Sequence, residues 1–117
     1  MTTTNAKLNN SIGLAMKAGK IASGDFSVEK AVRSGTAKLV MLDESASENT
    51  NKQWRDACSF RNIPLIRLRA IGSAIGKPAR MVAAVTDEGF SAMIIKNSNK
   101  NNEAMTELTE AMTDDKG

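Results

Sequence analysis

One helical segment of the sequence places an aromatic ring and two cations together on its outer side. Apolar residues after position 25 recur at helical spacing and define a buried side that includes Val28. At about 100° per residue, Phe26, Lys30 and Arg33 lie about 160°, 200° and 140° from Val28, on the opposite side. An exposed ring stacks on unpaired bases and cations neutralise phosphates, so this combination suits RNA. The simpler alternative is that Phe26 folds back over the core and the cations are only solvated.

The residues at the start of this helix add hydrogen-bond donors to the same surface. Gly24 allows another backbone or a ligand to come close, because it carries no side chain. Asp25 and Ser27 belong to the first turn, whose free amides are donors for phosphate groups or base edges. Together with Phe26, these residues form the first candidate site.

A second candidate site is the loop between a short predicted helix and the last predicted strand. It combines two cations with a small apolar residue and a stiffening proline, and its members are Ile75, Gly76, Lys77, Pro78, Ala79 and Arg80. In such a loop the apolar side chain can press against a base while the lysine and the arginine meet phosphates. An ordinary helix-to-strand turn explains the same residues equally well.

Catalytic and metal chemistry has little support in the sequence. The chain has no histidine, which removes the commonest general base and zinc ligand, and its single cysteine, Cys58, excludes an intramolecular disulfide. The run Gly72–Lys77 has three residues between its glycines where a Walker phosphate loop needs four. Asp43–Glu44 and Asp87–Glu88 precede predicted helices, and favourable interaction with helix N-termini explains them better than catalysis. We therefore expect no enzyme, no catalytic residues, no metal site and no cofactor.

Apolar periodicity alternates between helices and short strands along the chain. It predicts strands over about residues 20–23, 38–43, 64–68 and 81–85. It predicts helices over about residues 8–18, 25–34, 48–62, 71–75 and 87–95. The third helix follows a capping box at Ser45–Glu48. This alternation indicates an α/β domain in which helices pack on both faces of a four-stranded sheet.

Charge divides the chain into a basic body and an acidic tail. Residues 1–96 hold 14 basic and 8 acidic side chains, whereas residues 97–117 hold 2 basic and 5 acidic ones. We therefore expect one domain over residues 1–96, whose charge suits a polyanionic partner, followed by a tail that is disordered or weakly helical. The N-terminus lacks an apolar signal core and the longest strictly apolar run is Met81–Val85, so we expect a cytoplasmic protein with no membrane partner.

Six segments in chain order carry a further signal, and together they span about residues 8–95. They are Ser11–Gly24, Lys30–Gly35, Ala37–Val40, Asp43–Thr50, Ala74–Lys77 and Val85–Phe90. These segments resemble a bacterial branch of the ribosomal protein L7Ae family, whose members bind kink-turn RNA. The resemblance implies a three-layer α/β/α sandwich with a central four-stranded mixed sheet, and RNA binding without catalysis.

The resemblance also implies which residues meet RNA. In the family, the contacts come from the glycine-led start of the second helix and from the loop before the last strand, which correspond to the two candidate sites. Gly24 and Lys30 match the family pattern Gly-x-Asn-Glu-x-x-Lys, whereas Phe26 and Ser27 stand where Asn and Glu are usual. The expected RNA-contact residues are Lys20, Gly24, Asp25, Phe26, Ser27, Lys30, Arg33, Ile75, Gly76, Lys77, Pro78, Ala79 and Arg80.

We therefore expect a monomeric protein that stabilises kink-turn-like structured RNA, with ribosomal RNA as a candidate partner. The alternative is a protein-interaction module of the same fold that has lost kink-turn binding. In that case an exposed Phe26 would anchor a protein partner.

Overall fold

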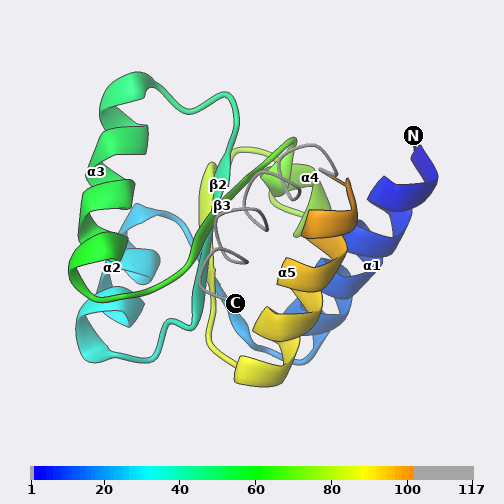
Figure 1. The fold of residues 1–117 in the computed structure, drawn as a ribbon, viewed down its shortest axis with the longest axis horizontal. Coiled ribbons are helices and arrows are strands. Elements are labelled where there is room, and N and C mark those ends of the chain that lie inside the picture. Colours follow the sequence, from blue (N-terminus) through cyan, green and yellow to red (C-terminus); the bar gives the residue numbers. More distant parts are fainter. Residues whose placement is uncertain (1, 102–117) are drawn as a thin grey trace, which may run out of the picture.

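The computed structural model describes residues 2–101 of the 117-residue chain, with side chains described for residues 6–98. Within this range, helices and strands alternate (Figure 1). In chain order they are α1 (Thr2–Lys17), β1 (Ile21–Ser23), α2 (Asp25–Ser34), β2 (Leu39–Asp43), α3 (Glu48–Phe60), β3 (Leu65–Leu68), α4 (Ile71–Ala74), β4 (Val82–Val85) and α5 (Glu88–Asn101). None of these helices combines the length and the apolar character needed to cross a membrane. The predicted acidic tail lies outside the described residues from residue 102 onward.

The strands form one mixed sheet in the order β1-β4-β2-β3. β4 runs antiparallel to both of its neighbours, whereas β2 and β3 are parallel. The register pairs Leu42 with Val82 and Asp43 with Leu68, while Ser23 pairs with Ala83. As a result, the start of β4 meets the ends of β1, β2 and β3 at one end of the sheet. The candidate site lies at this end.

Helices cover both faces of the sheet, which confirms the predicted three-layer α/β/α sandwich. Figure 1 shows α2 and α3 on one face and α1, α4 and α5 on the other. The side chains of β2 and β4 alternate between the two interfaces, as the period of a strand requires. The α2–α3 interface buries Val28, Val32, Val40, Leu42, Trp54, Cys58, Val82 and Ala84. The opposite interface buries Leu8, Ile12, Leu39, Met41, Ile71, Ile75, Val85 and Ile94.

The predicted capping box before α3 is wrong in its capping residue. Ser47, not Ser45, is the N-cap, and its Oγ accepts a hydrogen bond from the Thr50 amide at 3.1 Å. Ser45 is occupied elsewhere, because its amide and its Oγ both donate to Oδ1 of Asp43, at 2.9 and 2.8 Å. A carboxylate two residues back is the nearer acceptor and forms a local turn.

The last helix begins as predicted. Asp87 Oδ2 accepts a hydrogen bond from the Phe90 amide at 2.9 Å, so Asp87 interacts with the helix N-terminus as predicted. α5 then continues past residue 97 to Asn101. Asn97 is buried, and its Nδ2 donates to Ser11 Oγ at 2.6 Å, which ties α5 to α1.

Candidate nucleic-acid interface

The start of α2 is left without a side-chain cap. Gly24 precedes the helix with φ 92° and ψ 154°, and it has no side chain that can accept from the first turn. The first intrahelical bond joins the Val28 amide to the Gly24 carbonyl oxygen at 2.9 Å. The amides before it belong to Asp25, Phe26 and Ser27, and no described residue accepts a hydrogen bond from them. They remain donors for a phosphate or a base edge.

The loop before β4 lies directly beside Gly24. The Gly24 amide donates to the Val82 carbonyl oxygen at 3.0 Å, which extends the pairing of β1 with β4 beyond Ser23. The Arg80 guanidinium lies against the glycine, since a Cβ at Gly24 would be only 3.2 Å from Nη1 of Arg80. Any other residue would crowd this group and would also hold a strained positive φ. The two predicted sites, far apart in the sequence, therefore form one surface.

The outer side of α2 faces solvent, as the helical spacing predicts. The Phe26 side chain is 76% exposed, so the alternative in which it folds back over the core is wrong. Lys30 and Arg33 are exposed on the same helix, while Val28 is fully buried beneath them. Neither cation forms an ion pair with another described residue. The ring and the cations are thus available to a partner.

In the loop before β4, one predicted contact residue belongs to the core. Ile75 is only 4% exposed and packs among the residues between the sheet and α1, so its side chain is not presented as an apolar wedge. Its spacing of four residues from the buried Ile71 was the signal for a helical core position. Gly76 follows with φ 76°, and the exposed members of the loop are Gly76, Lys77, Pro78, Ala79 and Arg80.

The shape of this loop is fixed by its contact with α4. A Cβ at Gly72 would lie 2.6 Å from the carbonyl oxygens of both Lys77 and Pro78, so only glycine allows the loop backbone to pack there. The Lys77 amide donates to the Gly72 carbonyl oxygen at 2.8 Å, and the Arg80 amide donates to the Lys77 carbonyl oxygen at 2.9 Å. These bonds close the loop on itself before it enters β4.

Asp43 is a positioning residue, and it meets a different helix from the one that follows it in the sequence. It lies at the end of β2, and its Oδ2 accepts a hydrogen bond from the Ile71 amide at 3.0 Å, so it meets the start of α4 rather than that of α3. Burial alone would raise the pKa of Asp43, but the hydrogen bonds from Ser45 and Ile71 outweigh it and lower the pKa below the ordinary 3.8. Asp43 therefore fixes the start of α4, and the loop before β4 continues from the end of this helix.

Two other expected contact residues lie away from the start of α2. Lys20 is exposed at the opposite end of β1, where its carbonyl oxygen accepts from the Thr86 amide at 2.8 Å. Arg33 lies in the last turn of α2, about 10 Å along the helix from Phe26. Lys20 is therefore not part of the surface at the start of α2. Arg33 is connected to this surface along the outer side of the helix.

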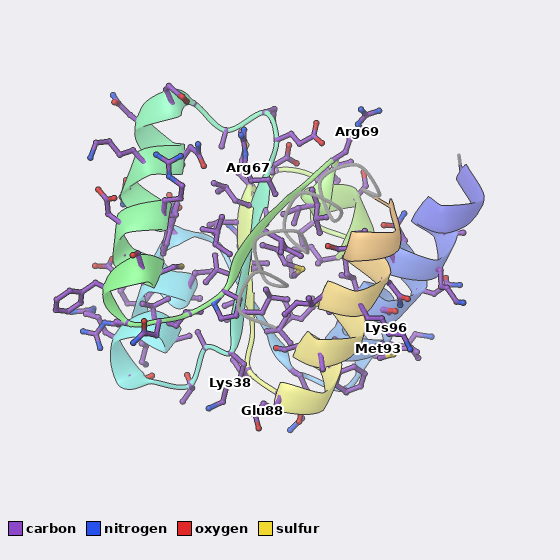
Figure 2. The ribbon with its side chains drawn as sticks, viewed as in Figure 1. Lys38, Arg67, Arg69, Glu88, Met93 and Lys96 are labelled. Atoms are coloured by element: carbon purple, nitrogen blue, oxygen red, sulfur yellow. The ribbon has the colours of Figure 1, made fainter. Side chains whose placement is uncertain are left out.

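Further cations lie toward the β3 edge of the sheet and on α5. Figure 2 shows Arg67 and Arg69 at one end of β3, Lys38 at the other, and Lys96 on α5. Arg67 donates to the Glu44 carbonyl oxygen at 2.9 Å, and Arg69 lies 3.9 Å from the Glu44 carboxylate. β3 is the sheet edge opposite β1, so these arginines are separated from Gly24 by the width of the sheet.

The remaining reactive group is a core thiol. Cys58 is buried on α3, and this burial raises the pKa of its thiol to about 11. A thiol with such a pKa is protonated at neutral pH and therefore a poor nucleophile. Among the described residues, no group of three or more histidine, cysteine, aspartate and glutamate side chains is placed to hold a metal ion.

With this geometry, the chain can be compared with known proteins. Residues 6–95 match the model of the Ribosomal protein L7Ae/L30e/S12e/Gadd45 family. The chain belongs to this family. It is 44% identical over 87 residues to RNA-binding protein YlxQ of Bacillus subtilis (strain 168), which covers 72% of this chain and 87% of that protein. It is 40% identical over 88 residues to RNA-binding protein YlxQ of Enterococcus faecium, covering 73% and 84%.

Solved structures share the fold of this chain. A protein of unknown function from Bacillus halodurans superposes with a TM-score of 0.74 at 36% identity, covering 79% of this chain and 96% of that one. A 15.5 kD RNA-binding protein of Giardia lamblia superposes with a TM-score of 0.66 at 18% identity, covering 84% and 87%. The second similarity shows the shared fold. The resemblance predicted from the six sequence segments is confirmed.

Proposed function

We propose that this L7Ae-family chain binds structured RNA of the kink-turn type, without catalysis, through the surface where the start of α2 meets the loop before β4. The observation that carries the proposal is the contact between Arg80 and Gly24. This contact joins uncapped amides, the exposed Phe26 ring and the cations of helix and loop into one surface. Two relatives with 40–44% identity are named as RNA-binding proteins, which supports RNA as the partner.

The chemistry of the surface suits a sharply bent duplex. A kink-turn bends at an internal loop flanked by tandem sheared G·A pairs, and bending brings phosphates close together. Lys30, Lys77 and Arg80 offset this repulsion, and the amides of the first turn of α2 donate to phosphate or base edges. A protein that contacts only the bent form shifts the RNA toward that form by its differential affinity.

Binding to two matched RNAs tests the proposal. The first is a kink-turn hairpin, and in the second the G·A pairs are replaced by Watson–Crick pairs. We expect preference for the kink-turn and an affinity that falls steeply with salt, with a slope that reflects about three phosphate contacts. Equal affinity for both RNAs would remove kink-turn specificity. Absence of RNA binding at low salt would favour the alternative, in which the exposed Phe26 anchors a protein partner.

The proposal extends to ribosomal RNA as the natural partner of a monomeric, cytoplasmic protein. Crosslinking in cells, followed by sequencing of the bound RNA, tests this part. We expect crosslinked sites at bent internal loops of ribosomal RNA, and crosslinks confined to other transcripts would redirect the proposal to those RNAs. Sedimentation of the purified complex measures its stoichiometry, for which we expect one protein per RNA.

A further inference from the structure

Two of the aromatic side chains of this protein are not used by the core. The chain contains three phenylalanines, one tryptophan and no tyrosine. Trp54 is buried, and Phe90 packs against the core, whereas Phe26 and Phe60 are 76% and 82% exposed. A single exposed apolar residue needs no explanation. Both exposed rings, however, lie on the α2–α3 layer and next to cations, and Phe60 is outside the surface described above.

Phe60 is paired with a guanidinium that is itself held in place. Arg61 follows the last residue of α3, and its Cζ lies 5.8 Å from the centre of the Phe60 ring, within the range of a cation–π contact. Its Nη1 donates to the Arg33 carbonyl oxygen at 3.4 Å. A guanidinium has five N–H donors, so others remain for a ligand. The ring and the guanidinium together form a platform, hereafter the Phe60–Arg61 platform.

This platform begins where the outer side of α2 ends. The hydrogen bond from Arg61 to Arg33 joins the C-terminal ends of α3 and α2, which Figure 1 shows side by side. Lys30 and Arg33 are exposed on α2 between Phe26 and this junction. Cations therefore lead from the start of α2 to Phe60, and a nucleic-acid strand can follow them with its phosphates.

We propose that the Phe60–Arg61 platform stacks an unpaired nucleotide of a strand that leaves the bent duplex bound at the start of α2. The inference rests on the proposed RNA-binding function. An unpaired nucleotide is required because paired bases present only their edges, whereas an exposed phenylalanine recognises a base by its face. RNA is favoured over a protein partner because the cations on α2 connect the proposed RNA-binding surface at the start of α2 to the platform.

The test compares three kink-turn RNAs, one blunt and two with about six unpaired adenosines at either the 5′ or the 3′ end. The full chain should bind one extended RNA about tenfold more tightly than the blunt RNA, which is the expected gain from one stacked base. Phe60→Ala should abolish this gain and leave blunt-RNA binding unchanged, while Phe60→Trp should retain it. Leu14→Ala is the matched control, because Leu14 is a 54% exposed apolar residue on α1, and it should change neither affinity.

Each failure has its own meaning. If the wild-type chain does not bind the blunt kink-turn, the proposed function fails. If it binds the blunt RNA but gains nothing from either extension, only the platform is overturned, and a protein becomes the better candidate for the partner of Phe60. A gain that persists in folded Phe60→Ala, or an equal loss on all three RNAs, also overturns the platform. Thermal melting of each variant establishes that it is folded.

Discussion

The starts of α2 and α3 differ in what is available to accept hydrogen bonds from their first amides. Both helices lie on the same face of the sheet and each follows a strand, and both begin with amides that lack intrahelical acceptors. At α3, Ser47 Oγ accepts from the Thr50 amide and Ser45 is tied to Asp43, so this helix start has a side-chain cap. At α2, Gly24 supplies no cap, and the neighbouring groups are the exposed Phe26 ring and the Arg80 guanidinium.

This difference separates a structural helix start from one that is open to a ligand. A glycine before a helix is only a few tenths of a kcal/mol less favourable than a capping side chain, so an open terminus costs about that much. Leaving the first-turn amides of α2 without a cap therefore lowers the stability of the fold only slightly. We expect substitutions of exposed residues at the start of α2 to change binding with little effect on folding, and substitutions at the start of α3 to do the reverse.

The largest expected effect is on binding at the open helix start. Lys30→Ala combined with Lys77→Ala should weaken kink-turn binding by about 2–4 kcal/mol, since each lysine contributes roughly 1–2 kcal/mol to a charged contact. At about 1.4 kcal/mol per tenfold, this corresponds to at least roughly 30-fold. Fluorescence anisotropy of labelled RNA measures it, and thermal melting should show little change.

A control for this double variant removes the same charge elsewhere. Arg67→Ala combined with Arg69→Ala changes the opposite edge of the sheet, farther from Gly24 than the Debye length of about 8 Å at physiological salt. It should have little effect on kink-turn affinity. An equal loss in both double variants would mean that overall charge, rather than the start of α2, drives binding.

The next effect tests the two positions that depart from the family pattern. Phe26→Asn combined with Ser27→Glu adds side chains that can hydrogen-bond the edges of sheared G·A pairs on an exposed surface. Two such bonds of about 1 kcal/mol each should improve kink-turn affinity by roughly tenfold or more. The gain should be absent on the RNA with Watson–Crick pairs. A loss on the kink-turn would instead identify Phe26 as a productive stacking residue.

A smaller effect, on folding alone, is expected at the closed helix start. Ser47→Ala removes the acceptor of the Thr50 amide and should lower the free energy of unfolding by about 1 kcal/mol. Urea denaturation measures this change, and RNA affinity should remain that of the wild-type chain. Weaker RNA binding by a folded Ser47→Ala would contradict a purely structural role for the start of α3, because it would place this helix start in the interface.

The smallest effect concerns the pH dependence of stability that comes from the Asp43 carboxylate, which accepts hydrogen bonds from Ser45 and Ile71. Since the folded pKa of Asp43 is lowered, its ionised form contributes stability above its ordinary pKa of 3.8, and this contribution is lost as the pH falls through the folded pKa. Asp43→Asn should therefore be less stable than the wild-type chain at pH 6, and the difference should shrink toward pH 2. Urea denaturation at both values measures it. A difference that does not shrink would mean that packing, not charge, makes Asp43 important.

Much of the fold follows from local patterns that the sequence displays. The burial of Val28 and the exposure of Phe26 and Lys30 were readable from a 3.6-residue period, because an amphipathic helix has one buried side. The start of α5 followed from the position of Asp87 before an apolar periodic segment. The sheet required the family resemblance, since strand order and direction depend on contacts between distant segments.

The features that could not be predicted from the sequence depend on competition between hydrogen-bond partners that come together only in the fold. Ser45 and Ser47 both precede α3, and the choice between them is made by Asp43, which captures Ser45. Asp43 reaches Ile71 because β2 and β3 are parallel and end together. The position of Ile75 in the core was missed for a different reason: it ends the predicted helix and starts the loop, and its side chain was expected to contact RNA with the rest of the loop.

The packing of Gly72 against the Lys77–Pro78 backbone also bears on how fast and how tightly the protein associates with its ligand. A loop already shaped by its own helix loses little conformational freedom on docking, so less of the interaction energy is spent on ordering it. Recognition then approaches the meeting of two preformed surfaces, at rates set by diffusion and charge. Differences in affinity between RNAs should accordingly appear in how long each complex persists rather than in how quickly it forms.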